Sequence, residues 1–485
     1  MSADKSIKKN YIYSMVSQVL LLGAPFITIP YTSRVLKPEA VGTASFVRSI
    51  ANYFVLFAGL GITRYACREV SYLQNDRLRR SQVFWNVKAL TFITVLLNIA
   101  VFLVLAYIYA RADFHLYVIA SIEVINILFD VTWVYAGMES FGITVLKSMA
   151  VRVAQIIFLL TFIKSNADLP YYVGGSISMA MLGNVVLWFL LPKYISRPKL
   201  KDIKPFNDFK VILQLFVPNI AIEIYTVLDK TMIGVFTGEP AENGYYEFCM
   251  KTVRMTITIV TAIAGVISPR IGFLFASKDM EQIYKYMYKS YSFMWMLGVP
   301  ICMGLIGISD NFVPWFFGAG YFRVAGLIKA ASLLMLATSF GNLTGAQYLI
   351  PTKRHNQFTK SVMIGAGVNF CLNLVLIPLF KAYGAVIASV IAEMSIAASQ
   401  LYMIRHELKI RKIFALGKNN YIAGIIMLVF LVVIGKKLAP SVIHTFMMIL
   451  SGALVYFSVL LILRDEFFME NAKAVLVSFR KKLHI

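Results

Sequence analysis

Several features that mark soluble enzymes are scarce in this sequence. Charged residues make up only 15% of the 485 residues and apolar residues 59%, so a water-facing globule of this length would be insoluble. The four cysteines lack paired spacing, and the five histidines are dispersed without a second ligand at metal-site spacing. No G-x-x-x-x-G-K-[ST] motif is present. We therefore expect no metal site, no cofactor, no catalytic centre and no ATP hydrolysis.

Acidic residues are also few. The chain has 24 Asp and Glu against 47 Lys and Arg, which gives a net charge of +23. Most of this excess lies in short gaps between apolar segments, where membrane orientation and anionic headgroups account for it. We therefore expect no nucleic-acid partner.

About fourteen apolar segments, each near the 20 residues that a membrane-spanning helix needs, divide the chain. We expect the spans to begin near Tyr11, Ala40, Gln82, Phe114, Phe141, Leu169, Phe209, Gly244, Tyr286, Val324, Gln357, Ala382, Tyr421 and Ser441. Basic residues gather in alternate gaps, with a gap nearly empty of charge after the fourth span. Because Lys and Arg stay in the cytoplasm during insertion, both termini are predicted to be cytoplasmic. The predicted fold is an all-α polytopic membrane protein.

The longest polar stretch runs from Lys193 to Lys210 and separates six spans from the remaining eight. It predicts four parts: an N-terminal six-helix lobe at 1–195, a cytoplasmic linker at 196–210, a C-terminal six-helix lobe at 211–410, and two additional transmembrane helices with a cytoplasmic tail at 411–485. A faint repeat supports two lobes, since repeated halves are common in transporters. Its matched residues are Gly42, Phe46 and Arg48 in the second span and Gly244, Phe248 and Lys251 in the eighth.

Several cations fall inside predicted spans, where a charge costs about 2.5 kcal/mol or more unless it faces a cavity or a partner. Arg48, Lys251 and Arg254 lie at similar depth, roughly 10–15 Å from the outer surface at 1.5 Å per residue. Helical spacing places Lys251 and Arg254 on one polar stripe with Glu247 and Thr258. A cavity lined by such cations selects anions, and guanidinium groups bind phosphate oxygens in pairs. The predicted substrate-binding residues are Arg34, Arg48, Lys88, Arg152, Lys251 and Arg254.

Structural roles are open for some of these cations. A second group lies close enough to span ends for the head groups to reach the membrane interface; it comprises Arg34, Lys88, Lys147 and Lys329. Pairing with Glu247 would likewise give part of the set of Arg48, Lys251 and Arg254 a structural role.

A second set of intramembrane charges is acidic. The fourth span is predicted to carry one polar face made of Glu123, Asn126, Asp130 and Trp133. A carboxylate in such surroundings can exchange a proton and couple an ion gradient to transport. The predicted coupling residues are Glu123, Asp130, Glu223, Asp229 and Glu393. The alternative is that Asp130, Glu223 and Asp229 only neutralise nearby cations.

Two stretches carry a family resemblance. The first, from Asn10 to Val70, has Pro25, Pro30, Tyr31, Arg34, Leu36, Gly42, Phe46, Ile50, Phe54 and a Gly59-Leu60-Gly61 turn before Arg64. The second, from Phe216 to Asp229, has Pro218 and is followed by Gly244-Tyr245-Tyr246. In these residues, and in length and span count, the chain resembles bacterial polysaccharide flippases of the O-antigen type. That family belongs to the multidrug/oligosaccharidyl-lipid/polysaccharide exporter superfamily.

The resemblance implies two six-helix lobes around a central cavity, two extra helices and alternating access. It also implies a location in the bacterial inner (cytoplasmic) membrane. The implied substrate is an oligosaccharide repeat unit on undecaprenyl diphosphate, moved from the cytoplasmic to the periplasmic leaflet with the help of an ion gradient. Implied partners are this lipid-linked oligosaccharide, membrane lipids, and polysaccharide polymerase and chain-length proteins. The family's cavity cations correspond to Arg34, Arg48, and either Lys251 or Arg254.

Three other functions compete with this interpretation. A peptidoglycan-precursor lipid flippase would share the superfamily, and gene neighbours would distinguish it. A cation-coupled multidrug exporter of the same fold would be expected to have an acidic cavity. A membrane-embedded glycosyltransferase or ligase would need a catalytic residue in a large periplasmic loop, and no loop of this chain is long enough.

Overall fold

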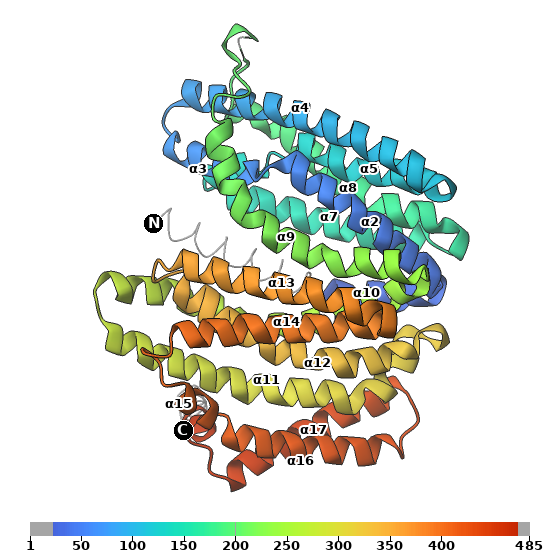
Figure 1. The fold of residues 1–485 in the computed structure, drawn as a ribbon, viewed down its shortest axis with the longest axis vertical. Coiled ribbons are helices and arrows are strands. Elements are labelled where there is room, and N and C mark those ends of the chain that lie inside the picture. Colours follow the sequence, from blue (N-terminus) through green and yellow to red (C-terminus); the bar gives the residue numbers. More distant parts are fainter. Residues whose placement is uncertain (1–22, 199, 474–485) are drawn as a thin grey trace, which may run out of the picture. The chain divides into compact units, whose positions relative to one another are not determined.

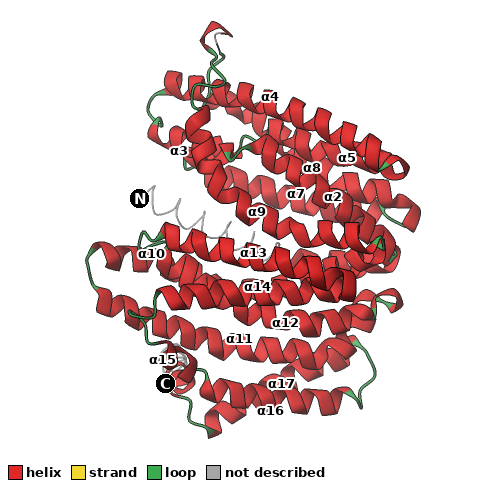
Figure 2. Cartoon of the chain, in the orientation of Figure 1, coloured by secondary structure: helices red, strands yellow, loops and turns green. Residues whose placement is uncertain are grey.

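The structure, a computed structural model, describes the backbone of residues 23–198 and 200–473 and their side chains, except those of 200, 217–226 and 262–266. This part of the chain consists of helices joined by loops and contains no β-strand (Figure 2). Over the described residues, eleven helical segments are long and apolar enough to cross a membrane. The predicted all-α polytopic fold is confirmed.

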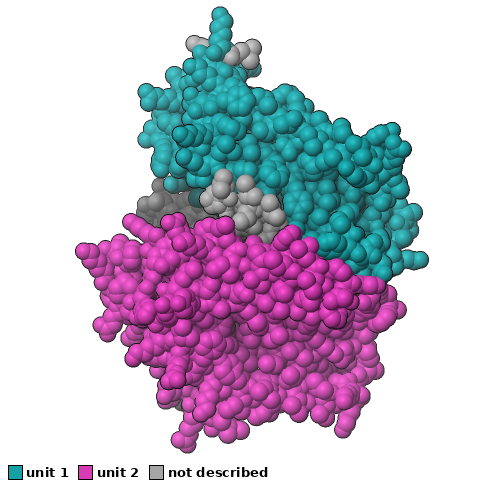
Figure 3. All heavy atoms as spheres, in the orientation of Figure 1, with its two compact units in different colours: residues 1–244 teal, residues 245–485 magenta. Residues whose placement is uncertain are grey.

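The chain divides into two compact units, residues 1–244 and 245–485 (Figure 3). The boundary falls inside α10 (Pro240–Ala276), whose first turn belongs to unit 1. A division at the 196–210 linker stays a prediction.

Unit 1 is a bundle of long helices joined by short connections (Figure 1). Residues 23–35 are helical. The helices that follow are α2 (Pro38–Gly59), α3 (Ile62–Tyr72), α4 (Arg77–Tyr109), α5 (Phe114–Phe129), α6 (Thr132–Gly137), α7 (Phe141–Phe162), α8 (Leu169–Leu190) and α9 (Phe209–Thr237). Small side chains on α2, including Ala44 and Ala51, are buried in a cluster with Phe102 of α4 and Ala120 of α5. Such residues allow membrane helices to approach closely.

Unit 2 is built around the long helix α11. Its helices are α11 (Met280–Phe317), α12 (Arg323–Gly341), a π-helical turn (Asn342–Leu349), α13 (His355–Phe380), α14 (Ala382–Met403), α15 (Ile410–Ala415), α16 (Lys418–Gly435) and α17 (Val442–Ile462). Trp295 of α11 packs against the rings of Phe340, Phe414 and Tyr421. Its indole nitrogen also donates a hydrogen bond to the carbonyl of Ile413 at 2.9 Å. These contacts fix α15 and the start of α16 on the central helix.

The predicted span starts agree closely with the helices. Five helices begin at the predicted residue: Phe114, Phe141, Leu169, Phe209 and Ala382. The largest difference is at α11, which begins at Met280 instead of near Tyr286. The predicted start of the first span, Tyr11, lies outside the described residues.

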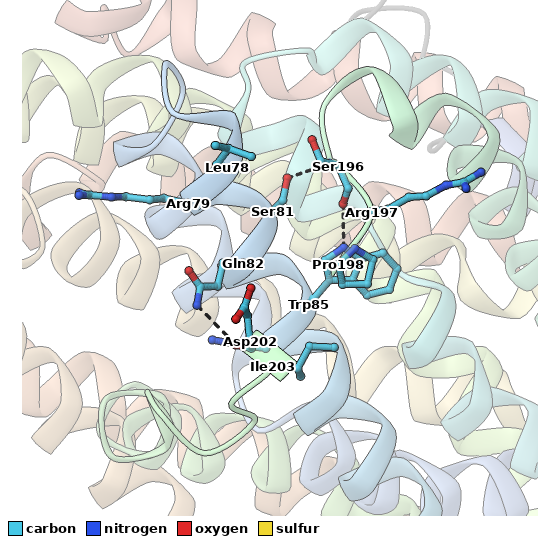
Figure 4. Close-up of a pocket in the computed structure, with 11 residues that line it drawn as sticks. Leu78, Arg79, Ser81, Gln82, Trp85, Ser196, Arg197, Pro198, Asp202 and Ile203 are labelled. Carbon is cyan, nitrogen blue, oxygen red and sulfur yellow. Dashed lines mark hydrogen bonds between the residues drawn. The ribbon is translucent and has the colours of Figure 1, made fainter. Parts of the chain in front are cut away.

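The segment after α8 is fixed to the first turns of α4 (Figure 4). Ser81 accepts a hydrogen bond from the backbone nitrogen of Ser196 at 2.8 Å, and the Trp85 indole donates to the carbonyl of Ser196 at 2.9 Å. Asn86 accepts from the backbone nitrogen of Lys204 at 2.8 Å. A cavity of about 280 Å³ remains between the two segments. Two points of the polar stretch, Ser196 and Lys204, are therefore held against α4.

Two glycines permit a close helix crossing within unit 1. A Cβ at Gly42 of α2 would lie 1.6 Å from the carbonyl oxygen of Pro240. A Cβ at Gly244 would lie 2.2 Å from the carbonyl oxygen of Pro38. The repeat predicted from the sequence paired these same two glycines, and the structure places them at one reciprocal contact between the first turns of α2 and α10.

Candidate substrate-binding site

A salt bridge in the middle of α2 joins one predicted binding residue to one predicted coupling residue. Arg48 lies roughly 15 Å along the helix from Pro38, at 1.5 Å per residue. Its Nε and Nη2 donate to Oε1 of Glu123 on α5 at 3.0 and 2.8 Å. The Arg48 side chain is 40% exposed and that of Glu123 14%. Oε2 of Glu123 is buried and accepts no hydrogen bond from the described residues.

A short chain of polar side chains lies one turn further along α5. Nδ2 of Asn184, on α8, donates to Oδ1 of Asn126 at 2.9 Å. Lys147 of α7 donates through Nζ to Oδ1 of Asn184 at 3.0 Å. Lys147 therefore binds inside the helix bundle of unit 1 instead of reaching the interface. The sequence did not single out Asn184, although a lone amide within the apolar run of α8 is a usable signal.

The end of α5 corrects one prediction from the sequence. The helix ends at Phe129, and Asp130 adopts an extended conformation with φ −69° and ψ 111°. A single polar face through Asp130 and Trp133 is therefore wrong, because Trp133 belongs to the separate helix α6. Oδ1 of Asp130 accepts from the backbone nitrogen and the hydroxyl of Thr132 at 2.9 and 2.6 Å. This carboxylate shapes the turn between α5 and α6.

The carbonyl groups at the end of α5 explain the position of Lys88. A helix end leaves carbonyl groups without partners, and cations are favoured there. Nζ of Lys88 donates to the carbonyl oxygens of Leu128 and Asp130 at 2.9 and 2.7 Å. The indoles of Trp188 and Trp133 donate to the carbonyls of Phe129 and Asp130 at 2.9 and 3.2 Å. Only 8% of Lys88 is exposed, so its ammonium caps a helix instead of reaching the interface.

The other two predicted cations of unit 1 lie apart from Arg48. Arg34 is exposed and donates through Nη1 to the carbonyl of Pro30 at 3.1 Å. Arg152 is half-buried on α7 and forms no ion pair in the described part of the chain. Their substrate-binding roles stay predictions.

The cations on α10 differ from one another. Lys251 pairs with Glu247 at 2.9 Å, one helical turn away, with side-chain exposures of 44% and 13%. Arg254 is exposed, and its guanidinium forms no ion pair with any described residue. The predicted polar stripe therefore exists as a row of side chains along α10. Of its two cations, Lys251 is already paired, so Arg254 is the one that is available to a ligand.

The remaining predicted coupling residues lie on two helices, Glu223 and Asp229 on α9 and Glu393 on α14. Asp229 on α9 is 6% exposed. Glu393 on α14 is half-buried, with Oε2 3.9 Å from the position of a Cβ at Gly341 of α12. The side chain of Glu223 lies outside the described residues.

A charged cluster that sequence reasoning missed joins two connections of unit 2. Nη1 and Nη2 of Arg354, before α13, bind Oε1 and Oε2 of Glu407, after α14, at 2.6 and 2.7 Å. The hydroxyl of Tyr348 donates to the same carboxylate. Burial alone would raise the pKa of Glu407, but the hydrogen bonds from Arg354 and Tyr348 and the Arg354 charge outweigh it, and the pKa is lowered. The two charges lie in different predicted cytoplasmic gaps, 53 positions apart, so no pattern in the sequence pairs them.

The described residues contain no group of three or more His, Cys, Asp and Glu that could hold a metal ion. What they contain instead is a many-helix membrane bundle with charged side chains at mid-helix positions in both units. That combination is typical of membrane transporters.

The comparisons with known proteins agree with this class. The family model described as "Polysaccharide biosynthesis protein" matches residues 7–275, more than half of the chain. The chain therefore belongs to the polysaccharide biosynthesis protein family, and the resemblance stated from the sequence is confirmed.

Similar proteins span most of the chain. A putative O-antigen transporter of Escherichia coli K12 is 22% identical over 83% of this chain and 97% of its own length. A probable low-salt glycan biosynthesis flippase of Haloferax volcanii, Agl15, is 19% identical over 80% of this chain and 81% of its own length. The solved inward closed structure of the lipid II flippase MurJ matches with a TM-score of 0.71 at 15% identity, covering 94% of this chain and 99% of that one. The solved inward-facing structure of a multidrug resistance MATE transporter matches with a TM-score of 0.60 at 15% identity, covering 83% of this chain and 96% of that one. The chain shares its fold with these two solved transporters. Together with the family and its O-antigen transporter relative, this identifies the protein as a membrane transporter.

Proposed function

We propose that this protein is a flippase for undecaprenyl-diphosphate-linked oligosaccharide repeat units, which it moves from the cytoplasmic to the periplasmic leaflet by alternating access. The family and the putative O-antigen transporter among its relatives support a polysaccharide precursor as the substrate. The observation that carries the proposal is the cationic character of the mid-helix positions. A diphosphate is the anionic part that such lipids share, whatever sugars they carry.

Two cations are suited to this ligand. Arg254 offers an exposed guanidinium without an ion-pair partner among the described residues. Arg48 is 40% exposed, and its Nε and Nη2 donate to a single oxygen of Glu123. A guanidinium can bind phosphate through two parallel hydrogen bonds, which an ammonium cannot do. Lys251, paired with Glu247, adds charge nearby on the same helix.

We propose further that Glu123 and the substrate phosphate compete for Arg48. When phosphate oxygens take the guanidinium, Glu123 is left as a half-buried carboxylate without a cation. An intramembrane carboxylate left without a partner is suited to carry a proton. Release of the phosphate would return Arg48 to Glu123 and expel the proton. This exchange would link substrate binding at Arg48 to proton binding at Glu123.

The first test replaces the arginines. Arg48→Ala and Arg254→Ala should abolish surface polysaccharide in a complementation assay of a deletion strain, while membrane levels by immunoblot stay normal. Arg48→Lys and Arg254→Lys should restore export only partly. Arg79→Ala is the matched control, because Arg79 is 78% exposed at the start of α4 and pairs with the nearby Asp76 at 3.5 Å. Normal polymer from both alanine variants at normal protein level would refute the assignment.

A second test concerns the substrate and the coupling. Mass spectrometry of the lipid fraction after gene deletion should show accumulated oligosaccharide diphosphate lipid; accumulation of a peptidoglycan precursor instead would favour the related lipid flippase. Glu123→Gln should keep substrate binding and lose gradient-dependent flipping. Asp130→Asn keeps an acceptor for Thr132 and serves as the comparison. Full transport by Glu123→Gln would remove this carboxylate from the coupling step.

A further inference from the structure

A cavity of about 740 Å³ lies at one end of unit 2, where α11 begins, α15 meets α16, and α17 has ended. Five cations from these four elements line it: Lys285, Lys289, Lys412, Lys418 and Arg464. Residues more than 170 positions apart in the chain thus bring like charges to one site. Such a gathering of like charges is unfavourable unless anionic groups lie close to it.

The charges of these five cations are not neutralised by close carboxylates of the described residues. None of them forms an ion pair within 4.0 Å in the described part of the chain, although four carboxylates also line the cavity. One of the four, Asp465, is engaged by the Asn419 amide at 3.2 Å and by the Phe468 backbone nitrogen at 3.0 Å. The ammonium of Lys412 lies 4.5 Å from the centre of the Tyr288 ring. The ring leaves the ammonium charge unneutralised.

The surrounding segment adds further positive charge. Residues 405–418 carry Arg405, Lys409 and Arg411 besides the two lysines of the cavity, and a single carboxylate, Glu407. Glu407 is bound by Arg354. The cavity and this segment together are therefore net positive in spite of the lining carboxylates, which favours an anionic ligand.

The position of α15 indicates that the cavity lies at the level of a membrane surface. On this short helix Ile413 is buried beneath Trp295, Phe414 is 44% exposed, and Arg411 and Lys412 are exposed. An exposed aromatic side chain beside basic ones is typical of a helix in the headgroup region. Beside Arg464, the last turn of α17 exposes Leu461 and Ile462 by 51% and 78%, an apolar surface suited to acyl chains.

We propose that this cavity binds the phosphate headgroup of an anionic phospholipid, with its acyl chains along the end of α17. Basic pockets between membrane helices on the cytoplasmic side bind such headgroups. The predicted topology places this end of unit 2 in the cytoplasmic leaflet, where anionic lipid is available. The proposal does not depend on the identity of the transported substrate, and its test does not measure transport.

The test uses purified full-length protein in neutral detergent and native mass spectrometry. Wild-type protein should bind phosphatidylglycerol in preference to phosphatidylcholine. The double variant Lys289→Ala/Lys412→Ala should bind phosphatidylglycerol roughly 25-fold more weakly, about fivefold for each lysine near an anionic surface. The matched control is Lys436→Ala/Lys437→Ala, which removes two exposed lysines at the other end of α16. The control should bind as the wild type does.

Three results would overturn the proposal. One is equal phosphatidylglycerol affinity in the cavity variant and the control. Another is displacement of phosphatidylglycerol by millimolar inorganic phosphate or pyrophosphate, which would mean a soluble-anion site. A third is loss of phosphatidylglycerol to an equimolar polyprenyl diphosphate, which would assign the cavity to transported lipid. Should the double variant unfold, Lys285→Ala and Lys418→Ala singly should each weaken binding about fivefold.

Discussion

The Arg354–Glu407 pair allows a quantitative test of unit 2. Two guanidinium nitrogens bind two carboxylate oxygens at 2.6 and 2.7 Å, with side-chain exposures of 22% and 29%. Exposed ion pairs contribute about 0.2–1 kcal/mol, whereas hydrogen bonds to charged groups contribute about 1.5–3 kcal/mol. This pair is half-buried and bidentate, so we expect a coupling energy of about 1–2 kcal/mol. Removing Glu407 alone should cost about 2–3 kcal/mol, because Arg354 and the Tyr348 hydroxyl both lose a partner.

The assay is a double-mutant cycle of Arg354→Ala and Glu407→Ala, with stability measured by denaturant unfolding in mixed micelles. The control cycle uses Lys329→Ala and Asp310→Ala, a salt bridge of 2.6 Å in which Asp310 is 74% exposed. The control should give about 0–1 kcal/mol. A coupling energy for Arg354 and Glu407 no larger than that of the control would refute the reasoning.

The same pair predicts a pH dependence. The pKa of Glu407 is lowered in the folded protein, so its stabilisation is complete above the unfolded pKa of about 4.3. It is lost as the pH falls through the lower folded pKa. The difference in unfolding free energy between wild type and Glu407→Gln should therefore stay constant from pH 8 to pH 6 and shrink below about pH 4. A change within the neutral range would contradict the assignment.

Three further predictions concern unit 1 and the topology. Gly42→Ala should destabilise the fold and lower membrane levels by immunoblot, because its Cβ meets backbone atoms of Pro240, whereas Gly59→Ala meets nothing within 4 Å and should be milder. Lys88→Met should lower the melting temperature by removing the cap of α5, at a cost of about 1–3 kcal/mol in unfolding free energy, without changing the affinity for the diphosphate lipid; an unchanged melting temperature would contradict this role. Reporter fusions after Lys204 and at the C-terminus should report cytoplasm, and one at Glu239 periplasm, because the loop between α9 and α10 carries no basic residue; a cytoplasmic signal at Glu239 would overturn the predicted topology.

Helix positions could be read from the sequence because they depend on local properties. An apolar run of about 20 residues must form a helix to satisfy its backbone in a bilayer, and flanking residues mark where it begins. Phe114, Phe141 and Ala382 were predicted and observed as helix starts for this reason. The break at Asp130 was not predicted, because the apolar run continues to Trp133 and the turn depends on a side-chain contact with Thr132.

The roles of the charged residues depended on the tertiary structure. The sequence identified Arg48, Lys88 and Lys251 as unusual, since an intramembrane charge is costly wherever the chain folds. Only the contacts show that Arg48 meets Glu123 across 75 positions while Lys88 caps α5. Helical spacing alone was enough for Glu247 and Lys251, which lie one turn apart. Local patterns determine helices and neighbours along a helix, whereas partners distant in the chain are decided by packing.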